Sequence, residues 1–272
     1  MNFGFIIPVC CKNDIHCKQL LRCIESIKKY HPYNKIILIN DSDEKYNLNN
    51  LFHNNENIII IQSCQKGSAD QQMFKILAET TLFEKAIFIQ DSMILNKKLE
   101  NIDKIDNITF LWHFTNHIIH WDIIEEPKTQ FNIENKINTH TDLIKHKIIK
   151  DYNKNKDFLK FSLNNLSNKH NWCGCFGNLC IITKKELLYI NNIVPFINMF
   201  TTYTSNRERR VNESIFSLIC HFCYSNKKFN NSYDGLYYDG YTASNYSNIP
   251  CEFDNLKWCC KNEYISKISF DR

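Results

Sequence analysis

The chain lacks the glycine patterns that mark the two commonest nucleotide-binding loops. Only six glycines and five prolines occur among its 272 residues. No G-x-G-x-x-G follows the first apolar run, and no G-x-x-x-x-G-K-[ST] is present. The first absence excludes a dinucleotide-binding dehydrogenase and the second a P-loop NTPase, because each uses those glycines to bring backbone amides close to phosphate.

Long apolar runs and an export signal are also missing. No stretch reaches the about 18 successive apolar residues that a membrane-spanning helix needs. The first residues carry no basic cluster ahead of a long apolar core, so we expect no signal peptide, no membrane span and a cytoplasmic location. The thirteen cysteines are then expected to be reduced thiols, mostly in the core. A zinc site is the lesser alternative; it would use Cys10–Cys11, Cys173-x-Cys175 and Cys259–Cys260.

The net charge of the chain is small, and acidic and basic residues are both common. Charged residues make up 23% of the chain and hydrophobic residues 43%, as in an ordinary globular protein. A net charge of +4 suits anionic small molecules but is too weak and scattered to indicate nucleic acid as a partner. This length fits one α/β domain with an appended lobe, and the composition gives no oligomeric state.

The N-terminal part alternates strand and helix patterns. Apolar runs at 3–11, 35–42, 57–63 and 86–93 have no helical period, which is typical of strands buried on both faces of a parallel sheet. Helical spacing follows the first run as far as Pro32. Ser68 and Gln71 form a capping-box pattern that opens a helix to about residue 82. This β-α-β-α order predicts a parallel sheet with right-handed crossovers.

The expected strands end in residues suited to a nucleotide. The 35–42 run finishes with Asp41, Lys66-Gly67 follows the 57–63 run, and Asp91 lies near the end of the 86–93 run. Open α/β sheets bind ligands at their carboxyl edge, and a glycine before a helix N-terminus lets phosphate or ribose approach backbone amides. Asp91 is then a carboxylate directed at a metal–diphosphate, or, in the simpler alternative, a turn residue.

The order of these pieces resembles the nucleotide-binding half of GT-A-fold glycosyltransferases. The matching segments lie within about residues 3–95 and are Phe5-Ile-Ile-Pro-Val9, Ile39-Asn-Asp-Ser-Asp43, Lys66-Gly-Ser-Ala69 and Ile87-Phe-Ile-Gln-Asp-Ser92. The resemblance implies a nucleoside-diphosphate sugar as donor and a glycan or other hydroxyl compound as acceptor. It places the donor against Pro8, Val9, Cys10, Asp41, Lys66, Gly67, Gln90, Asp91 and Ser92.

The resemblance also implies a Mn²⁺ or Mg²⁺ ion, which GT-A enzymes bind through a D-x-D motif. Here that segment reads Gln90-Asp-Ser-Met93, with one carboxylate instead of two. Asp91 is therefore the expected metal ligand, and His221 or Asp239 is a candidate for a second ligand from the C-terminal part. A single carboxylate can hold Mg²⁺ together with phosphate oxygens and water.

Several stretches of the second half add predicted elements and one further candidate site residue. Residues 96–107 have the spacing of a short amphipathic helix, and 108–114 that of a strand. The polar segment 125–166 predicts a surface insertion over the active site. In Asn171-Trp-Cys-Gly-Cys-Phe-Gly177 the resemblance implies that Gly174 lines the donor sugar, although a tight turn with buried aromatics explains the same residues.

The last informative stretch is an amphipathic helix that begins near residue 205. Its apolar stripe consists of Val211, Ile215, Leu218, Ile219 and Phe222 and leaves Arg209 and Glu213 on the polar side. The resemblance implies a catalytic base here, Glu213 or Glu208, with Arg210 beside phosphate. A solvated helix face with i,i+4 ion pairs is the alternative.

We therefore expect one GT-A-like α/β domain over residues 1–272. A mostly parallel nucleotide-binding sheet flanked by helices would occupy about 1–107, and a smaller acceptor-side lobe would occupy 108–272. The expected activity is metal-assisted transfer of a sugar to an acceptor hydroxyl. Two alternatives stay open: a non-catalytic glycosyltransferase-like binding protein, and a nucleotidyltransferase, although Cys10-Cys-Lys-Asn13 lacks the glycine-rich loop typical of the latter.

Overall fold

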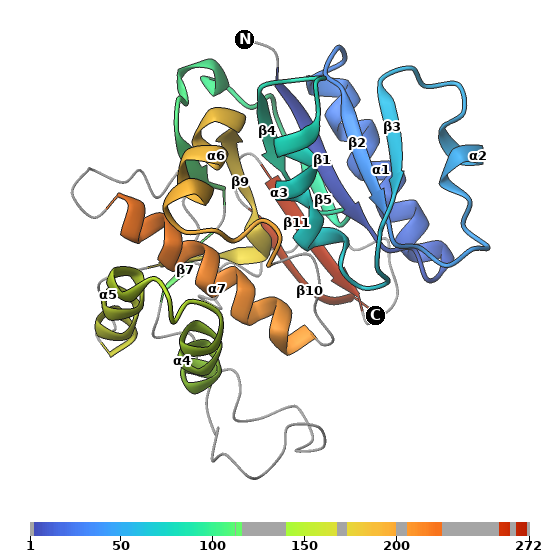
Figure 1. The fold of residues 1–272 in the computed structure, drawn as a ribbon. Coiled ribbons are helices and arrows are strands. Elements are labelled where there is room, and N and C mark those ends of the chain that lie inside the picture. Colours follow the sequence, from blue (N-terminus) through green and yellow to red (C-terminus); the bar gives the residue numbers. More distant parts are fainter. Residues whose placement is uncertain are drawn as a thin grey trace.

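The computed structural model describes residues 3–111, 113–115, 140–167, 173–199, 206–224, 256–261 and 265–270. Its N-terminal half alternates strands and helices in the predicted order (Figure 1). The elements are β1 (Phe3–Val9), α1 (Asp14–Tyr30), β2 (Ile36–Asn40), α2 (Leu48–Phe52), β3 (Ile58–Gln62), α3 (Ala69–Glu79) and β4 (Lys85–Phe88).

A six-stranded sheet in the order β3-β2-β1-β4-β9-β6 forms the centre of the molecule. The first four strands are parallel to one another, as the sequence predicts. Strand β9 (Cys180–Thr183) then runs antiparallel to both β4 and β6 (Ile108–Phe110). The predicted fold class, a mostly parallel sheet flanked by helices, is therefore confirmed.

Helices cover both faces of this sheet because its strands are apolar on both sides. Phe5, Ile7 and Val9 of β1 face α1, whereas Ile6 faces the layer that contains α3. The second layer is completed by α4 (His140–Asp151), α5 (Lys156–Ser167), α6 (Lys184–Ile193) and α7 (Asn206–Cys223). Figure 1 shows α3, α6 and α7 on one side of the sheet and α1 on the other.

Two small sheets extend the central one. Strand β7 (His113–Thr115) pairs with β8 (Cys173–Cys175), and a single 3-10 turn, η4 (Phe176–Asn178), links β8 to β9. Strand β5 (Met93–Leu95) pairs with β11 (Ile265–Phe270), which in turn pairs with β10 (Leu256–Lys261). The end of the described chain thus returns to the segment that directly follows Asp91.

One local prediction is wrong and a second holds only in part, and tertiary contacts explain both differences. Residues 96–107 contain only the short 3-10 helix η1 (Ile102–Lys104), because the surrounding backbone bonds to distant side chains. Helix α3 begins after Ser68 as predicted, but the Ser68 side chain does not cap it; its hydroxyl donates to the carbonyl oxygen of Gln65 at 2.7 Å. The carboxylate of Asp41 instead accepts from the backbone in front of that helix.

The segment expected as a surface insertion also differs from the expectation. Of residues 125–166, those from 140 onward form α4 and α5, and residues 116–139 lie outside the described residues. Leu143, Ile144, Ile148 and Phe158 are buried in the core that also contains α7. These helices therefore support α7. In the part of the chain that the structure describes, no helix has the length and apolar character needed to cross a bilayer.

Candidate functional site

The carboxyl edge of the parallel strands collects most of the predicted site residues. Cys10 follows β1, Asp41 follows β2, Lys66 and Gly67 follow β3, and Asp91 follows β4. Parallel strands end at the same edge, so segments far apart in sequence become neighbours there. Pro8 and Val9 belong to the last part of β1 and pair with Ile39 and Asn40 of β2.

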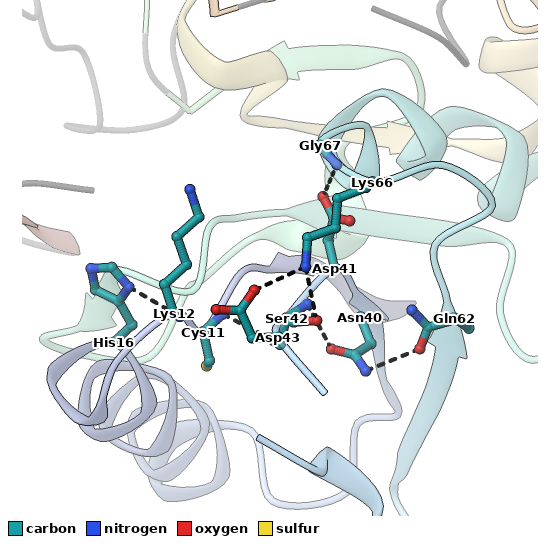
Figure 2. Close-up of polar contacts among 10 residues, drawn as sticks. All are labelled: Cys11, Lys12, His16, Asn40, Asp41, Ser42, Asp43, Gln62, Lys66 and Gly67. Carbon is teal, nitrogen blue, oxygen red and sulfur yellow. Dashed lines mark hydrogen bonds and ion pairs between the residues drawn. The ribbon is translucent and has the colours of Figure 1, made fainter. Parts of the chain in front are cut away.

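Asp41 shapes the glycine turn in front of α3. Its Oδ2 accepts a hydrogen bond from the backbone amide of Gly67 at 2.5 Å, and Gly67 has a φ of 84° (Figure 2). The carboxylate is 4% exposed. Burial raises its pKa above the usual value, and the Gly67 amide partly offsets this by stabilising the charged form. The positive φ explains why a glycine stands here.

Lys66 turns toward Asp43 rather than toward Asp41. Its Nζ donates to Oδ1 of Asp43 at 3.0 Å and to the carbonyl oxygen of Ser42 at 3.3 Å (Figure 2). This bond raises the pKa of Lys66 and lowers that of Asp43. The lysine side chain is 62% exposed, so a cation lies at the surface of this edge, within reach of an anionic ligand.

The loop after β1 is tied to both of its neighbours. The backbone amide of Cys10 donates to Oδ2 of Asp91 at 3.1 Å, and that of Cys11 donates to Oγ of Ser42 at 2.9 Å. Burial, with a smaller contribution from the Asp91 carboxylate, raises the pKa of the Cys11 thiol to about 12. Cys11 is therefore a protonated, structural thiol.

Asp91 lies in the tight turn between β4 and β5. The amide of Met93 donates to the carbonyl oxygen of Gln90 at 3.0 Å, which closes this turn. Asp91 is 4% exposed and Ser92 5% exposed. Gly177 of η4 has a φ of 59°, and a Cβ there would lie 2.5 Å from Nε2 of Gln90. The predicted glycine-bearing segment is thus packed directly against the Asp91 turn.

Helix α7 completes the edge from the other side. Nε of Arg209 lies 3.6 Å from Oδ2 of Asp70 in the first turn of α3 and 3.6 Å from Oε1 of Glu213. Asp70 and Glu213 are each 5% exposed. Nδ2 of Asn212 donates to Oε1 of Gln71 at 3.2 Å, which joins the same two helices. The start of α3 and the first half of α7 are therefore held together by polar groups.

The predicted polar side of α7 does not face solvent. Every residue from 211 to 220 is buried, including the polar side chains of Asn212, Glu213, Ser214 and Ser217. The alternative of a solvated helix face does not hold for these residues, because α3, β8 and the α4–α5 pair surround this helix. Burial makes the Arg209–Glu213 pair far less screened than an exposed i,i+4 pair.

The structure brings some predicted residues together and separates others. Gly174 lies in β8, which packs against α7, and the charge of Glu213 acts on the Cys175 thiol of the same strand. His221 lies two turns beyond Glu213, near Tyr224, whose hydroxyl bonds to Glu186 of α6. Helix α7 therefore carries His221 away from the edge where Asp91 lies. Glu208 stays in the first turn of α7.

Asp91 is the carboxylate of this edge that we expect to bind a divalent ion. Asp91 offers a hard oxygen ligand of the kind that Mg²⁺ and Mn²⁺ accept, and donor phosphates would supply further oxygens. Among the described residues no group of three His, Cys, Asp or Glu side chains could hold a metal by itself. Cys220 and Cys223, which have the spacing of a zinc-binding pair, form no such group and no disulfide. Asp239 lies outside the described residues.

The sequence patterns did not single out Asp70, whose carboxylate the structure places beside Arg209. Arg210 is the next residue along the helix, about 100° around the axis, and its carbonyl oxygen accepts from Oγ of Ser214. Asp70 directly follows the Lys66-Gly-Ser-Ala segment and begins a helix, so an acidic residue at a helix start was the available signal.

Contacts and through-space charge effects link these segments around the carboxyl edge. The charge of Asp70 acts on Asp41, and Asp70 and Glu213 each lie 3.6 Å from Nε of Arg209. The charge of Glu213 acts on Cys175 of β8, η4 packs on Gln90, and the β1 loop bonds to Asp91 and Ser42. Open α/β sheets bind ligands at the carboxyl ends of their strands, so this edge is the candidate functional site.

Comparison with known proteins finds solved structures only. No protein-family model matches the sequence, and no curated protein matches it. The chain is similar to S. aureus TarS, with 16% identity and a TM-score of 0.33, over 40% of this chain and 21% of TarS. The matched part thus spans about a fifth of the TarS chain.

Two other similar structures are matched over most of this chain. The galactosyltransferase LgtC, solved with donor and acceptor sugar analogues, has 9% identity and a TM-score of 0.43, over 78% of this chain and 70% of LgtC. Core-mannan synthase A (CmsA/Ktr4) from Aspergillus fumigatus, in its Mn/GDP form, has 10% identity and a TM-score of 0.44, over 80% and 69%. Likenesses this distant do not assign a function.

Proposed function

We propose that this protein is a glycosyltransferase that moves a sugar from a nucleoside diphosphate to an acceptor hydroxyl. The observation that carries the proposal is the gathering of three features at the carboxyl edge. They are the Gly67 turn held by Asp41, the buried Asp91 bonded to the Cys10 amide, and the buried Glu213 beside Arg209. A donor diphosphate requires backbone amides and a metal-binding carboxylate, and an acceptor hydroxyl requires a base.

The nucleoside would lie over the ends of β1 and β2. Pro8, Val9 and Cys10 form the floor on one side, and Asp41 holds the Gly67 turn on the other. Backbone amides at the start of α3 favour a negative charge nearby. The exposed Lys66 supplies a positive charge at the same edge. The donor would therefore be bound through its ribose and its phosphates.

Asp91 is the residue that would hold a divalent ion. When bound, such an ion neutralises charge that develops on the leaving diphosphate. The chain's own contribution is to keep Asp91 in place, through the bond from the Cys10 amide and the packing of Gly177 on Gln90. Ser92 and Gln90 lie in the same turn, and Gly174 lies in the neighbouring strand β8.

Transfer needs a base for the acceptor hydroxyl. In the proposed step the carboxylate of Glu213 takes the hydroxyl proton, and the acceptor oxygen forms a bond to the anomeric carbon of the sugar. The bond from that carbon to the phosphate oxygen breaks, and its electron pair leaves with the nucleoside diphosphate. Glu208, in the first turn of α7, is the alternative base, with Arg210 beside it.

The first prediction concerns donor binding and turnover. We expect calorimetry to detect UDP, GDP or dTDP binding with Mn²⁺, and the matching nucleotide sugar to be hydrolysed or transferred. Asp91→Ala should abolish metal-dependent turnover and leave the fold intact by circular dichroism. Asp157→Ala on the exposed surface of α5 is the control and should leave both unchanged.

Three outcomes would count against this proposal. Absence of binding for every nucleotide would reject it outright. Binding without turnover of any donor would favour a non-catalytic binding protein, which the single carboxylate at residue 91 makes a real alternative. Release of pyrophosphate in place of a nucleoside diphosphate would identify a nucleotidyltransferase.

A further inference from the structure

A buried glutamine of α3 is bonded to both ends of the loop that joins β3 to α3. Gln72 lies in the first turns of α3 and is 5% exposed. Its Oε1 accepts from the backbone amide of Cys64 at 3.2 Å. Its Nε2 donates to Oγ of Ser63 at 2.8 Å and to Oγ of Ser68 at 2.7 Å. One side chain thus connects the first and last residues of the loop 63–68.

The two serines carry this contact on to the middle of the loop. The hydroxyls of Ser63 and Ser68 each donate to the carbonyl oxygen of Gln65 at 2.7 Å. Because each hydroxyl has a single proton, which is engaged on Gln65, each can only accept from Gln72. The Gln72 amide therefore fits in one orientation, and the loop has one hydrogen-bonding arrangement.

The residues held by this network are the ones at the carboxyl edge. Lys66 and Gly67 lie between Gln65 and Ser68 in the loop. The Lys66 ammonium reaches Asp43 at 3.0 Å, and the lysine side chain remains 62% exposed (Figure 2). The loop thus presents an accessible positive charge on a base that is fixed from inside the protein.

Helix α3 does not need Gln72 in order to begin. The backbone amides of Gly67 and Ala69, in front of and at the start of the helix, already bind the carboxylate of Asp41. The three bonds of Gln72 are directed at the loop, and their effect is to keep it ordered. Ordering a flexible residue costs about 1–2 kcal/mol, so a loop that became ordered only with its ligand would bind that ligand more weakly.

We propose that Gln72 is a positioning residue for donor binding, which acts through Lys66. It holds the loop 63–68 so that the ammonium lies where the diphosphate of the donor binds. The inference rests on the proposed function and adds to it a residue that sets the affinity for the donor. Gln72 touches no reacting group, so its effect belongs to binding and not to the chemical step.

A double-mutant cycle on nucleotide binding tests this route. Gln72→Met keeps the length of the side chain and removes its three hydrogen bonds, and Lys66→Met removes the charge. By calorimetry with Mn²⁺ and the nucleoside diphosphate that the wild type binds best, each change alone should weaken binding about tenfold. The double variant should also lose about tenfold, because a misplaced loop no longer has an ammonium to misplace. Additive losses near a hundredfold, or wild-type affinity in Gln72→Met, would overturn the inference.

Hydrogen exchange follows the loop itself. In Gln72→Met the amides of Cys64 and Gly67 should exchange faster, whereas those of β3 should not change. Weaker binding with unchanged exchange in the loop would show that Gln72 does not act by ordering it. Ser63→Ala removes one of the three bonds and is the milder variant, with a smaller effect of the same sign. Gln62→Met replaces an exposed glutamine just before the loop and should leave affinity and exchange as in the wild type.

Turnover separates this inference from the proposed function. Gln72→Met should raise the donor KM about tenfold and leave kcat within about twofold of the wild type. A lower kcat with an unchanged donor KM would overturn the inference and leave the proposed function standing. A wild-type protein that binds no nucleotide would overturn the proposed function, and the inference with it.

Discussion

At the residue scale, Gly67 is a residue of the carboxyl edge whose backbone conformation favours glycine. Its φ of 84° lies in the left-handed region, and its amide is bonded to Asp41. A Cβ added there would meet nothing within 4 Å, so the demand comes from the backbone alone and not from crowding. This residue therefore allows backbone strain to be measured apart from packing.

We predict that Gly67→Ala destabilises the protein by about 1 kcal/mol, because an alanine pays for the left-handed conformation without gaining or losing a contact. Gly67→Asn should cost less, since asparagine tolerates this region better than alanine does. Urea unfolding at neutral pH measures both. An alanine variant as stable as the wild type would show that the turn relaxes to a negative φ.

The sequence alone does not show which arginine of α7 faces α3. The charged cluster at the start of this helix was recognisable from the run of arginines and glutamates. Successive residues point about 100° apart around a helix. Which arginine faces α3 therefore depends on how α7 is rotated about its own axis. Packing by α3 and β8 sets that rotation, and it selects Arg209 over Arg210.

At the scale of elements, the end of α1 is joined to the segment after β5 by a buried histidine. Nε2 of His31 accepts a hydrogen bond from the amide of Leu99 at 3.1 Å, and the ring lies against Phe3 and Phe5. His31 is 5% exposed. Burial, with a smaller effect from Lys98, lowers the pKa of His31 from 6.5 to about 4.

This contact predicts a loss of stability in mild acid. The folded pKa lies below the unfolded one, so the unfolded state binds the extra proton between pH 6.5 and 4. Stability is complete above that window and falls as the pH decreases through it, by about 3 kcal/mol in total. The protonated ring also cannot accept from Leu99.

The test compares urea unfolding of three proteins between pH 7 and 4. His31→Gln removes the titration and should flatten this part of the stability profile relative to the wild type. His53→Gln replaces an exposed histidine and should leave the slope unchanged. Identical slopes in the wild type and His31→Gln would show that other groups cause the acid sensitivity.

The same region explains why a predicted helix is absent. Residues 96–107 have helical spacing, yet the amide of Leu99 is bonded to His31, and Nζ of the buried Lys85 donates to the carbonyl oxygen of Ile102 at 2.6 Å. These long-range bonds replace the helical ones, and Asn101 adopts a φ of 56°. Nothing in the local sequence reveals partners that lie elsewhere in the chain.

At the scale of the whole molecule, the end of the described chain stabilises the segment beside the site. Ile265 of β11 is fully buried in the core that contains α1, and it pairs with Leu95 of β5. The Asp91 turn directly precedes β5. The position of Asp91 thus depends on a strand contributed from the other end of the described residues.

We predict that Ile265→Ala destabilises the protein by about 2 to 5 kcal/mol and loosens β5 as well as β11. Ile265→Val, which removes a single methyl group, should cost about 1 kcal/mol. Urea unfolding gives the energies, and hydrogen exchange reports on the amides of Met93–Leu95. Unchanged exchange in β5 would show that β11 does not support this segment.

The sequence by itself determined the parallel half of the fold. Uninterrupted apolar runs separated by helical spacing leave few alternatives, because such strands must be covered on both faces. The same runs place Asp41, Gly67 and Asp91 near strand ends, and strand ends of a parallel sheet meet at one edge. Those residues were therefore found by local pattern alone.

Only the tertiary structure decided how the second half meets that edge. The burial of α7, the sharing of Arg209 between Asp70 and Glu213, and the departure of His221 from the edge all depend on packing between distant elements. A periodic pattern shows that a helix has an apolar face. It does not show that the other face is also buried, because that depends on neighbours whose positions no local pattern records.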